Sequence, residues 1–458
     1  WKDRSVNPPG EEIIMSEITP VLHKTKTQGA QTQRFDLSPD FSGKESSFSA
    51  YRKQAWESFK NLPFPADSDE AWRRTSIKSL QLGQLSTDAS ANHSQPVPDD
   101  LIKPLADDAH GGEIVFSNDM VSISLDESLK KQGVVFCDLQ NAQFENAEML
   151  EKILQHSKTY LEDKFAALAA AFGSNGVLLY VPKGVNVDKP LHSLIWSSGE
   201  GRLNAFQVFV WMDENSSATY VHESASPENE GGQNLHAGIM DIYAGPGSRL
   251  NFVELQSLGS NEWNFTHEKV SVDRDAEVDW IFGALGSHLT KNFSDLNLVG
   301  QGGTGKMSGF YFTNGNQHLD HDTQQNHLAP NTTSDLLFKG ALLGESRSVW
   351  QGMIYVAENA TKTDGYQANR NLVLSEKSRA DSIPGLEILT DDVRCTHGAT
   401  VGKIDADQVF YLESRGIPRQ EAEKLIVEGF FDPIMQRIPF EGVKKRFQAA
   451  IEAKMSEY

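Results

Sequence analysis

The region between Gly176 and Lys403 consists of short β-rich runs that follow one another about every ten residues. Gly, Asn, Asp or Pro separates these runs, and apolar and polar residues alternate within examples such as FQVFVWM and KMSGFYFT. No amphipathic helical pattern interrupts them, which excludes alternating strand–helix–strand units here. Regular spacing over this length leaves a β-sandwich, a propeller or a β-solenoid. Because clean repeats are absent, the spacing alone does not choose among these three all-β folds.

Helical patterns flank the β-rich region on both sides. Residues 146–172 carry the clearest one, with apolar positions that recur at helical spacing. The chain before residue 46 is polar and rich in Thr, Gln, Ser and Lys, which is typical of disorder. We therefore expect four parts: a disordered N-terminal extension over residues 1–45, a mixed and mainly helical domain over 46–175, a β domain over 176–404, and a helical domain over 405–458.

Helices return in the last part of the chain. Asp405 with Gln408 resembles a capping box at the start of the first helix, and Pro418 begins the second. Pro433 and Pro439 are expected to delimit the last helix. Together these helices carry more apolar surface than a small bundle can bury alone. That surface packs either against the β domain or against a partner, and the sequence leaves both open.

The chain is strongly acidic, with 42 Lys and Arg against 63 Asp and Glu and a net charge of −21. Nucleic acids and anionic membranes require clustered Lys and Arg, so neither is expected as the main partner. The two cysteines, Cys137 and Cys395, are too few for a disulfide framework in a chain of 458 residues, which favours a reducing cytosol. No apolar run of about 18 residues indicates a transmembrane helix, and no secretory signal is visible near the start. We therefore expect a cytoplasmic protein.

One glycine-rich segment, GQGGTGKM over residues 300–307, nearly matches a phosphate-binding P-loop. Such a loop needs Ser or Thr after Lys306 to hold a metal ion, but Met307 stands there. It also needs a helix directly afterwards, whereas the next residues, SGFYFT, predict a strand. We therefore interpret this segment as a turn between strands and not as an ATP site.

A second segment, QHLDHDTQQNH, offers His318, Asp320, His321 and His327 as ligands for zinc or iron. In an extended strand His318 and Asp320 share one face whereas His321 points to the other, so a single site is awkward. Histidines held by hydrogen bonds within a sheet are the favoured interpretation.

Cys395 and His397 form the last candidate site, in the segment DDVRCTHGATVGKI. Because they are two residues apart, both project from the same face of a strand. Thiolate sulfur and imidazole nitrogen suit iron, zinc or copper(I). Two ligands are too few for a closed site, so any metal would need further ligands from elsewhere, such as another subunit. A buried structural thiol is the alternative interpretation.

The segment over residues 317–431, which begins QHLDHDTQQNHLAP and ends EKLIVEGFF, is similar almost throughout to the SufB/SufD family, and within it to the SufD branch. DEAWRRTSIKSL resembles the Trp-Arg entry segment of the family. FAALAAAFGSNGVLLYVPKGVNVDKPL resembles the start of the family core. The resemblance therefore covers the chain from about Ser47 to its C-terminus.

This resemblance implies a mainly β fold, a right-handed parallel β-helix core flanked by N-terminal and C-terminal helical regions. It also implies a non-enzymatic scaffold of the SUF system, which pairs with a SufB-type protein through the β-helices and carries a SufC-type ATPase on its C-terminal helices. An iron–sulfur cluster or iron would bind transiently at the subunit interface, and no permanently bound cofactor is expected. Whether the isolated chain forms a homodimer is left open.

His397 matches the family histidine implicated at that interface and is the first candidate ligand for the cluster or iron, with Cys395 beside it as the second. The helices over residues 405–431 match the SufC-docking region. A SufB-like subunit is the alternative, disfavoured because GLEILTDDV carries no thiol upstream of Cys395. A carbohydrate-active β-solenoid enzyme is a further alternative. It needs paired carboxylates, and the adjacent Asp391 and Asp392 would face opposite ways in a strand.

Overall fold

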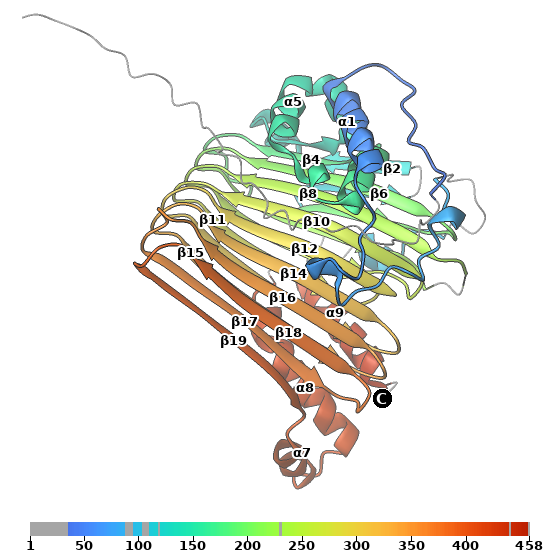
Figure 1. Cartoon of the computed structure of the whole chain (residues 1–458), viewed down its shortest axis with the longest axis vertical. Coiled ribbons are helices and arrows are strands. Elements are labelled where there is room, and N and C mark those ends of the chain that lie inside the picture. The colour runs from blue at the N-terminus through green and yellow to red at the C-terminus, as the bar shows by residue number, and fades with distance from the viewer. Residues whose placement is uncertain are drawn as a thin grey trace, which may run out of the picture.

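The computed structural model describes residues 35–87, 95–102, 110–117, 120–228, 231–438 and 441–456 (Figure 1). Most of the expected N-terminal extension, residues 1–34, lies outside this part of the chain. Phe35, in the remainder of that extension, packs against Phe59 and Phe172 with ring centroids 5.2 Å and 5.6 Å away. The chain is therefore attached to the folded N-terminal region from Phe35 onward.

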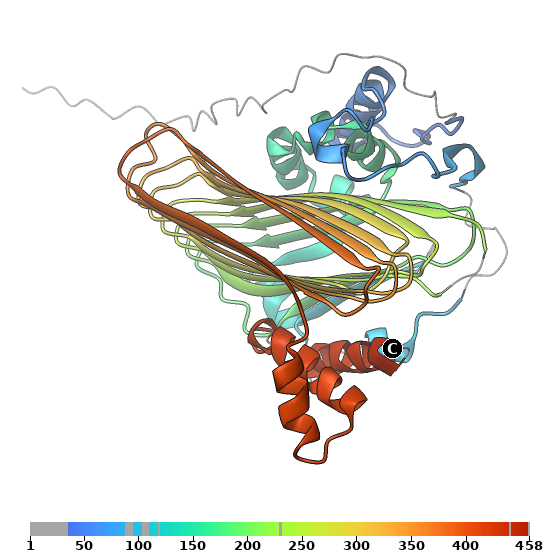
Figure 2. The same cartoon turned by 60° about the horizontal axis from the view of Figure 1, so that its bottom comes forward.

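Two facing sheets form the body of the molecule (Figures 1 and 2). Over the described residues, one sheet has ten strands in the spatial order β2 (Met120–Leu125), β1 (Gly112–Ser117), β5 (Leu191–Trp196), β7 (Ser217–Ala225), β9 (Arg249–Ser257), β11 (Glu277–Ala284), β13 (Thr304–Thr313), β15 (Thr333–Leu342), β17 (Thr363–Val373) and β19 (Val393–Lys403). The other has nine, in the order β3 (Val135–Asp138), β4 (Gly176–Val181), β6 (Leu203–Met212), β8 (Asn234–Ala244), β10 (Glu262–Val272), β12 (Leu289–Leu298), β14 (His318–His327), β16 (Arg347–Val356) and β18 (Arg379–Ile388). Neighbouring strands are antiparallel in the pairs β1–β2 and β3–β4 and parallel in the others described.

From β4 onward the chain alternates between the two sheets, so each pair of consecutive strands adds one coil. Equivalent inner positions stack from coil to coil: Tyr220 on β7 is in register with Phe252 on β9, and Phe252 with Trp280 on β11. Their ring centroids lie 5.7 Å and 5.8 Å apart, and all three side chains are fully buried. A sandwich or propeller does not stack parallel strands in this way. The expected parallel β-helix flanked by helices is therefore confirmed.

Helices of the N-terminal region cover the outer face of the nine-stranded sheet (Figure 1). α1 (Ser47–Asn61) begins with a capping box between Ser46 and Ser49. α6 (Lys164–Phe172) is buried along its whole length, and Phe165 packs against Phe265 of the sheet with ring centroids 4.2 Å apart. The other elements of this region are α2 (Asp99–Ile102), α3 (Glu127–Lys131), α4 (Leu139–Glu145), α5 (Ala147–His156) and 3₁₀ turns at Glu70–Trp72, Leu82–Gln84 and Thr159–Leu161.

Three helices follow β19: α7 (Ala406–Glu413), α8 (Arg419–Met435) and α9 (Glu441–Ser456). α9 and the second half of α8 pack on the outer face of the ten-stranded sheet, where the rings of Phe447 and Phe310 lie 4.6 Å apart. α7 extends beyond the last coil (Figure 1). The β domain thus buries α9 and leaves α7 uncovered. Among the helices that the structure describes, none is long and apolar enough to span a membrane.

Pro433 lies inside α8, so the expectation that it separates two helices is wrong, while Pro439 lies outside the described residues. Proline removes one helical hydrogen bond and crowds the carbonyl four residues earlier, which here belongs to Gly429. The last turn persists because Ile434 and Met435 are buried against the ten-stranded sheet. Burial of these side chains therefore outweighs the tendency of proline to end a helix.

The turn before β13 and the bend before β19 bear on the two enzyme alternatives, an ATP site and a carbohydrate-active enzyme. Gly302 has a φ of +77° in the turn before β13, as expected of a glycine-rich turn in place of a P-loop. Asp391 and Asp392 lie in a bend that precedes β19, so the expectation that they occupy a strand is wrong. The segment over residues 300–307 therefore lacks the backbone of a P-loop, and strand geometry does not bear on the directions of Asp391 and Asp392.

Candidate functional site

The last coil of the solenoid leaves each sheet with a free edge. β19 ends the ten-stranded sheet and β18 ends the nine-stranded sheet, and neither has a further strand partner among the described residues. Apolar side chains are partly open here: Leu386 and Ile388 on β18 and Val401 on β19 are 39%, 37% and 50% exposed. Free edges and exposed apolar residues are typical of a surface that pairs with another protein.

Cys395 and His397 lie on the inner face of β19. In the parallel pairing of β17 with β19, Cys395 is opposite Gly365 and His397 is opposite Gln367, which is fully buried inside the solenoid. Cys395 is half-buried against a small apolar cluster that includes Ile354, whereas His397 is exposed. The structure thus places the two side chains on one face, as their spacing predicted.

Burial raises the pKa of the Cys395 thiol, and the charge of Asp364 raises it further, while a hydrogen bond from the backbone N–H of Gly365 lowers it. The neutral thiol is therefore the resting form, and metal binding would displace its proton. The other cysteine, Cys137, lies on β3 at the opposite end of the solenoid, where burial raises its pKa to about 12. Both cysteines are free.

The described residues do not complete the candidate pair with a ready-made group of metal-binding side chains. No group of three or more Cys, His, Asp or Glu side chains in that part of the chain is arranged to hold a metal ion. Cys395 and His397 supply two ligands, fewer than a closed iron or zinc site requires. The pair therefore fits a metal only with ligands from outside the pair.

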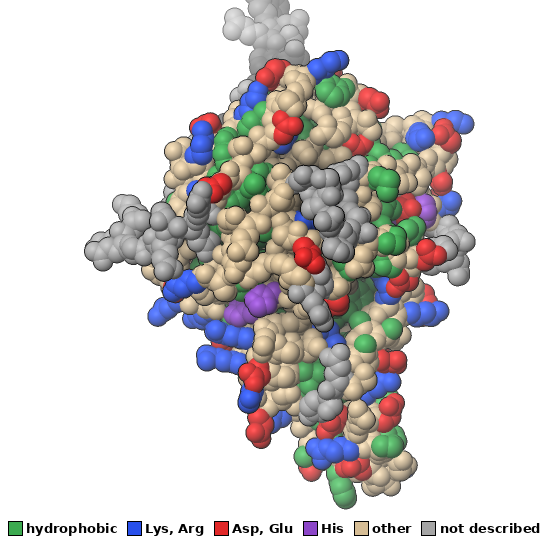
Figure 3. Space-filling model, turned by 90° about the vertical axis from the view of Figure 1, so that its right-hand side faces the viewer, with side chains coloured by type: hydrophobic (Ala, Val, Ile, Leu, Met, Phe, Trp, Pro, Cys, Tyr) green, Lys and Arg blue, Asp and Glu red, His purple; other side chains and the backbone are tan. Residues whose placement is uncertain are grey.

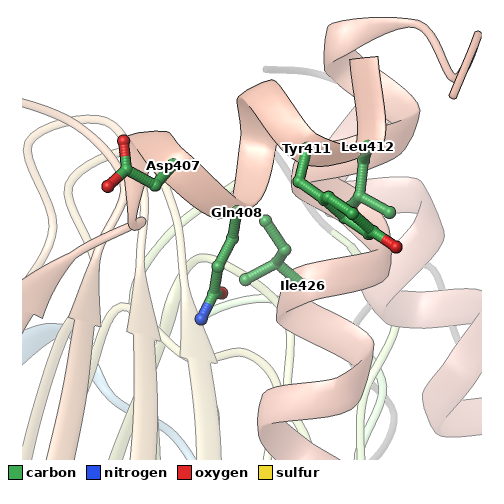
Figure 4. Close-up of a pocket in the computed structure, with 5 residues that line it drawn as sticks. All are labelled: Asp407, Gln408, Tyr411, Leu412 and Ile426. Atoms are coloured by element: carbon green, nitrogen blue, oxygen red, sulfur yellow. The ribbon is translucent and has the colours of Figure 1, made fainter. Parts of the chain in front are cut away.

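A shallow hollow lies between α7 and α8 (Figure 4). Asp405 caps α7 by accepting the backbone N–H of Asp407 at 2.9 Å, and Gln408 turns toward the hollow. The expected capping box is thus only half formed. The side chains that line the hollow are Asp407, Gln408, Tyr411, Leu412 and Ile426.

Aromatic side chains stand uncovered next to this hollow. Phe410 and Tyr411 on α7 are 70% and 56% exposed. Figure 3 shows hydrophobic side chains at the lower tip of the molecule, set among charged ones. Exposed aromatic residues with a charged surround are typical of a docking surface for another protein.

Two protein-family models match the sequence over most of its length. The model for the SufBD core domain, described as SUF system FeS cluster assembly, matches residues 195–430, which is more than half of the 458 residues. The model for the SufBD protein N-terminal region matches residues 41–192. The chain belongs to the SufBD family.

Relatives of this SufBD chain include both named branches of the family. The iron-sulfur cluster assembly protein SufB of Bacillus subtilis (strain 168) is 29% identical over 404 residues, which cover 85% of this chain and 86% of the relative. The SufD protein of the same organism is 29% identical over 412 residues, covering 88% and 93%. A SufBD family protein of Staphylococcus epidermidis is 28% identical over 326 residues, covering 71% and 70%. These identities do not separate the SufB type from the SufD type.

The histidine-rich strand β14 of the SufBD chain divides its side chains between two faces, as the sequence predicted. His318 and Asp320 face outward, where Asp320 forms an ion pair of 3.0 Å with Lys291. His321 faces inward, and its ring lies 5.0 Å from that of Phe282. Burial lowers the pKa of His321 to about 3, which keeps it neutral. These groups do not form a single site.

His327 lies close to Cys395 at the open end, which the spacing of the two residues in the sequence does not indicate. A Cβ atom on Gly365 would lie 3.3 Å from both the Sγ of Cys395 and the Nε2 of His327. His327 therefore belongs with the candidate pair on β19 rather than with the outward-facing His318. No local pattern could have shown this, because the stacking of separate coils brings these residues together.

Proposed function

We propose that this chain is a SufD-type scaffold of the SUF iron–sulfur cluster assembly system, with no chemical step of its own. It pairs with a SufB-type protein through the last coil of its solenoid and binds a SufC-type ATPase through α7 and α8. The observation that carries this proposal is the position of Cys395 and His397, which face the open end beside two free strand edges. Ligands in this position are accessible to a partner, and the metal site is incomplete until the partner adds its own ligands.

Pairing through the last coil is supported by what that coil exposes. The free edges of β18 and β19 offer backbone N–H and C=O groups that a partner strand can satisfy. The exposed Leu386, Ile388 and Val401 add apolar area, and burying such area contributes roughly 25 cal/mol per Å². A second solenoid with the same kind of end would continue both sheets across the interface. In isolation the same edges allow a homodimer.

The iron or iron–sulfur cluster is cargo in this proposal and is held transiently at the interface. Thiolate and imidazole groups both bind iron, and the partner supplies the remaining ligands. Two ligands from one chain hold a metal weakly, so the cluster can leave when the interface opens. The compartment proposed is the reducing cytosol, where two free thiols persist.

The SufD type is preferred on the cysteine content. The whole chain has two cysteines, and the segment GLEILTDDV upstream of Cys395 has none. The resemblance leads us to expect a cysteine-rich stretch there in a SufB-type chain. A SufB-like subunit is the alternative, and it predicts cluster assembly on pairing with a SufD-type partner.

Binding of the ATPase is assigned to α7 and α8 because Phe410 and Tyr411 stand uncovered beside the hollow. α7 begins at Ala406, directly after β19 ends at Lys403. A movement of α7 would therefore act on the strand that carries Cys395. ATP turnover in the partner could in this way open the interface.

Co-expression with SufB-type and SufC-type chains tests the proposal. The expected result is a complex of the three chains that accumulates iron and sulfide on reconstitution. His397→Ala should leave the complex assembled and abolish cluster formation, because an exposed side chain contributes little to folding. Thr396→Ala, an exposed neighbour on the other face of β19, is the matched control.

Two outcomes of this experiment would count against the proposal. Cluster formation by the His397→Ala complex at the level of the Thr396→Ala complex would remove His397 from the ligands. Failure of the wild-type chain to co-purify with either partner would contradict the scaffold itself.

A further inference from the structure

A second imidazole lies close to Cys395 inside the last coils. The position of a Cβ atom on Gly365 is 3.3 Å from the Cys395 Sγ, 3.3 Å from the His327 Nε2 and 3.4 Å from the Ile354 Cγ2. Because residue 365 is glycine, no side chain of its own separates the sulfur from the nitrogen. His327 is fully buried, whereas His397 is exposed.

Hydrogen bonds fix the tautomer of His327. Thr332 Oγ1 donates to the carbonyl of Ala329 at 3.1 Å, so it accepts from the Nδ1–H of His327, 2.7 Å away. Nε2 therefore presents its lone pair, which accepts from Ser334 Oγ at 2.8 Å. Ser334 in turn accepts from Gln325 Nε2 at 2.6 Å. Metal-binding histidines are held in the same manner, through the ring nitrogen that does not bind the metal.

A buried oxygen without a partner lies on the same inner face. Gln367 is the next inner residue after Gly365 on β17 and is opposite His397. Its Nε2 donates to the carbonyls of Gly352 and Gly385, at 3.4 Å and 2.9 Å. Its Oε1 accepts no hydrogen bond from the described residues, although the side chain is fully buried. Buried polar atoms normally have a partner, so this oxygen, which lies beside Gly352, is available to a water molecule inside the solenoid.

We propose that Cys395 and His327 bind one divalent metal ion, Fe²⁺ in the cell, across the gap that Gly365 leaves. This inference rests on the proposed function, in which iron is the cargo, and adds an inner ligand to it. The thiol gives its proton to solvent as the sulfur–metal bond forms, and the metal keeps its oxidation state. When His327 Nε2 binds the metal, it no longer accepts the hydrogen bond from Ser334. Ser334 still accepts a hydrogen bond from Gln325.

Titration of the purified full chain with Co²⁺ under reducing, anaerobic conditions tests this site. Co²⁺ substitutes for Fe²⁺ at mixed sulfur and nitrogen sites, and its bond to a thiolate gives charge-transfer absorption. We expect one Co²⁺ per chain and loss of this absorption in Cys395→Ser. His327→Gln and Gly365→Ala should each weaken Co²⁺ binding about tenfold or more, the first by removing the nitrogen and the second by filling the gap.

The matched control is His222→Gln in a distant coil. His222 is also fully buried, with its Nδ1 2.8 Å from Ser193 Oγ, and this variant should bind Co²⁺ as the wild type does. Circular dichroism and thermal unfolding establish that each variant is folded. A further measurement avoids buried substitutions, because His397 is exposed. X-ray absorption of the Co²⁺ complex of His397→Ala should still show one sulfur ligand and one imidazole nitrogen ligand.

The inference is overturned if the wild-type chain alone binds no Co²⁺, or if His327→Gln and Gly365→Ala bind it as tightly as His222→Gln. It is also overturned if the imidazole signal disappears in His397→Ala, since the exposed histidine would then be the donor. Each of these results leaves the co-purification with SufB-type and SufC-type chains as it was. Failure of this inner site is therefore distinguishable from failure of the scaffold.

Discussion

Arg446 on α9 places its Nη2 nitrogen 2.7 Å from both carboxylate oxygens of Glu223 on β7. Burial by itself would raise the pKa of Glu223, but Arg446 and the neighbouring His192 hold that pKa at about 2. The carboxylate is therefore charged in the folded protein at neutral pH, within a largely apolar junction. This pair ties the C-terminal helices to the side of the solenoid.

Arg446→Ala should lower the free energy of unfolding by about 3 kcal/mol, because it leaves a buried carboxylate without its main counter-ion. Lys445→Ala, the exposed neighbour on α9, is the control and should change stability by about 0.5 kcal/mol or less. Urea denaturation followed by circular dichroism at pH 7 measures both. Equal losses in the two variants would show that apolar contacts alone hold α9.

Glu262 on β10 should make the protein less stable as the pH rises. Burial raises the pKa of its carboxyl group from 4.5 to about 7. Between these two pH values the folded chain keeps a proton that the unfolded chain has lost, so the free energy of unfolding falls with increasing pH. Above pH 7 the whole penalty is present, at most about 3 kcal/mol.

Glu262→Gln removes this titration, since the amide is neutral at every pH. The stability of the variant relative to wild type should therefore increase by about 2 kcal/mol between pH 5 and pH 8. Thr396→Ala, an exposed change that removes no titratable group, is the control, and its difference from wild type should be the same at both pH values. A Glu262→Gln difference that does not change with pH would contradict the raised pKa.

Lys291 on β12 and Asp320 on β14 form an ion pair of 3.0 Å with both side chains fully buried. Asp320→Ala leaves Lys291 only Asp322, at 3.8 Å, and should cost about 3 kcal/mol of stability. The double replacement Lys291→Met with Asp320→Leu should cost about 1 kcal/mol or less, because no buried charge is left unpaired. Urea denaturation of this double variant and of the single variants Lys291→Met and Asp320→Leu measures the coupling, and strictly additive losses would exclude it.

The class of fold could be predicted because alternation within the β-rich runs reports which side chains face inward. The pairings of β7 with β9 and of β9 with β11 could not be predicted, since the in-register stack of Tyr220, Phe252 and Trp280 arises only when separate coils meet. Local preference failed at Pro433, where burial of Ile434 keeps the helix going. The sequence pattern thus carries the period of a strand but not the contacts between coils.

The candidate site was likewise predictable from the sequence only in part. Cys395 and His397 are two residues apart on one strand, so their common face follows from strand geometry. Gly365 comes from β17 and His327 from β14 in the facing sheet, and their place beside Cys395 depends on the register of β17 with β19 and of β14 with β16. Spacing along the chain therefore gives the common face of Cys395 and His397, but it does not show that His327 lies near them.

The uncovered aromatic residues of α7 give a test of docking that is independent of the metal ligands. Phe410→Ser combined with Tyr411→Ser should reduce binding of a SufC-type ATPase about tenfold or more, because buried aromatic anchors dominate interface energies. Both side chains are exposed, so the variant should unfold at the wild-type urea concentration and should still pair with a SufB-type chain through β18 and β19.

Gln448→Ala on the exposed side of α9 is the matched control for that variant. Isothermal titration with the purified ATPase gives the affinity of each chain, and co-purification with the SufB-type partner gives the state of the other interface. Unchanged ATPase affinity in the double variant would move the docking surface away from α7. Loss of both partners at once would instead show that α7 supports β19, since the helix begins directly after that strand ends.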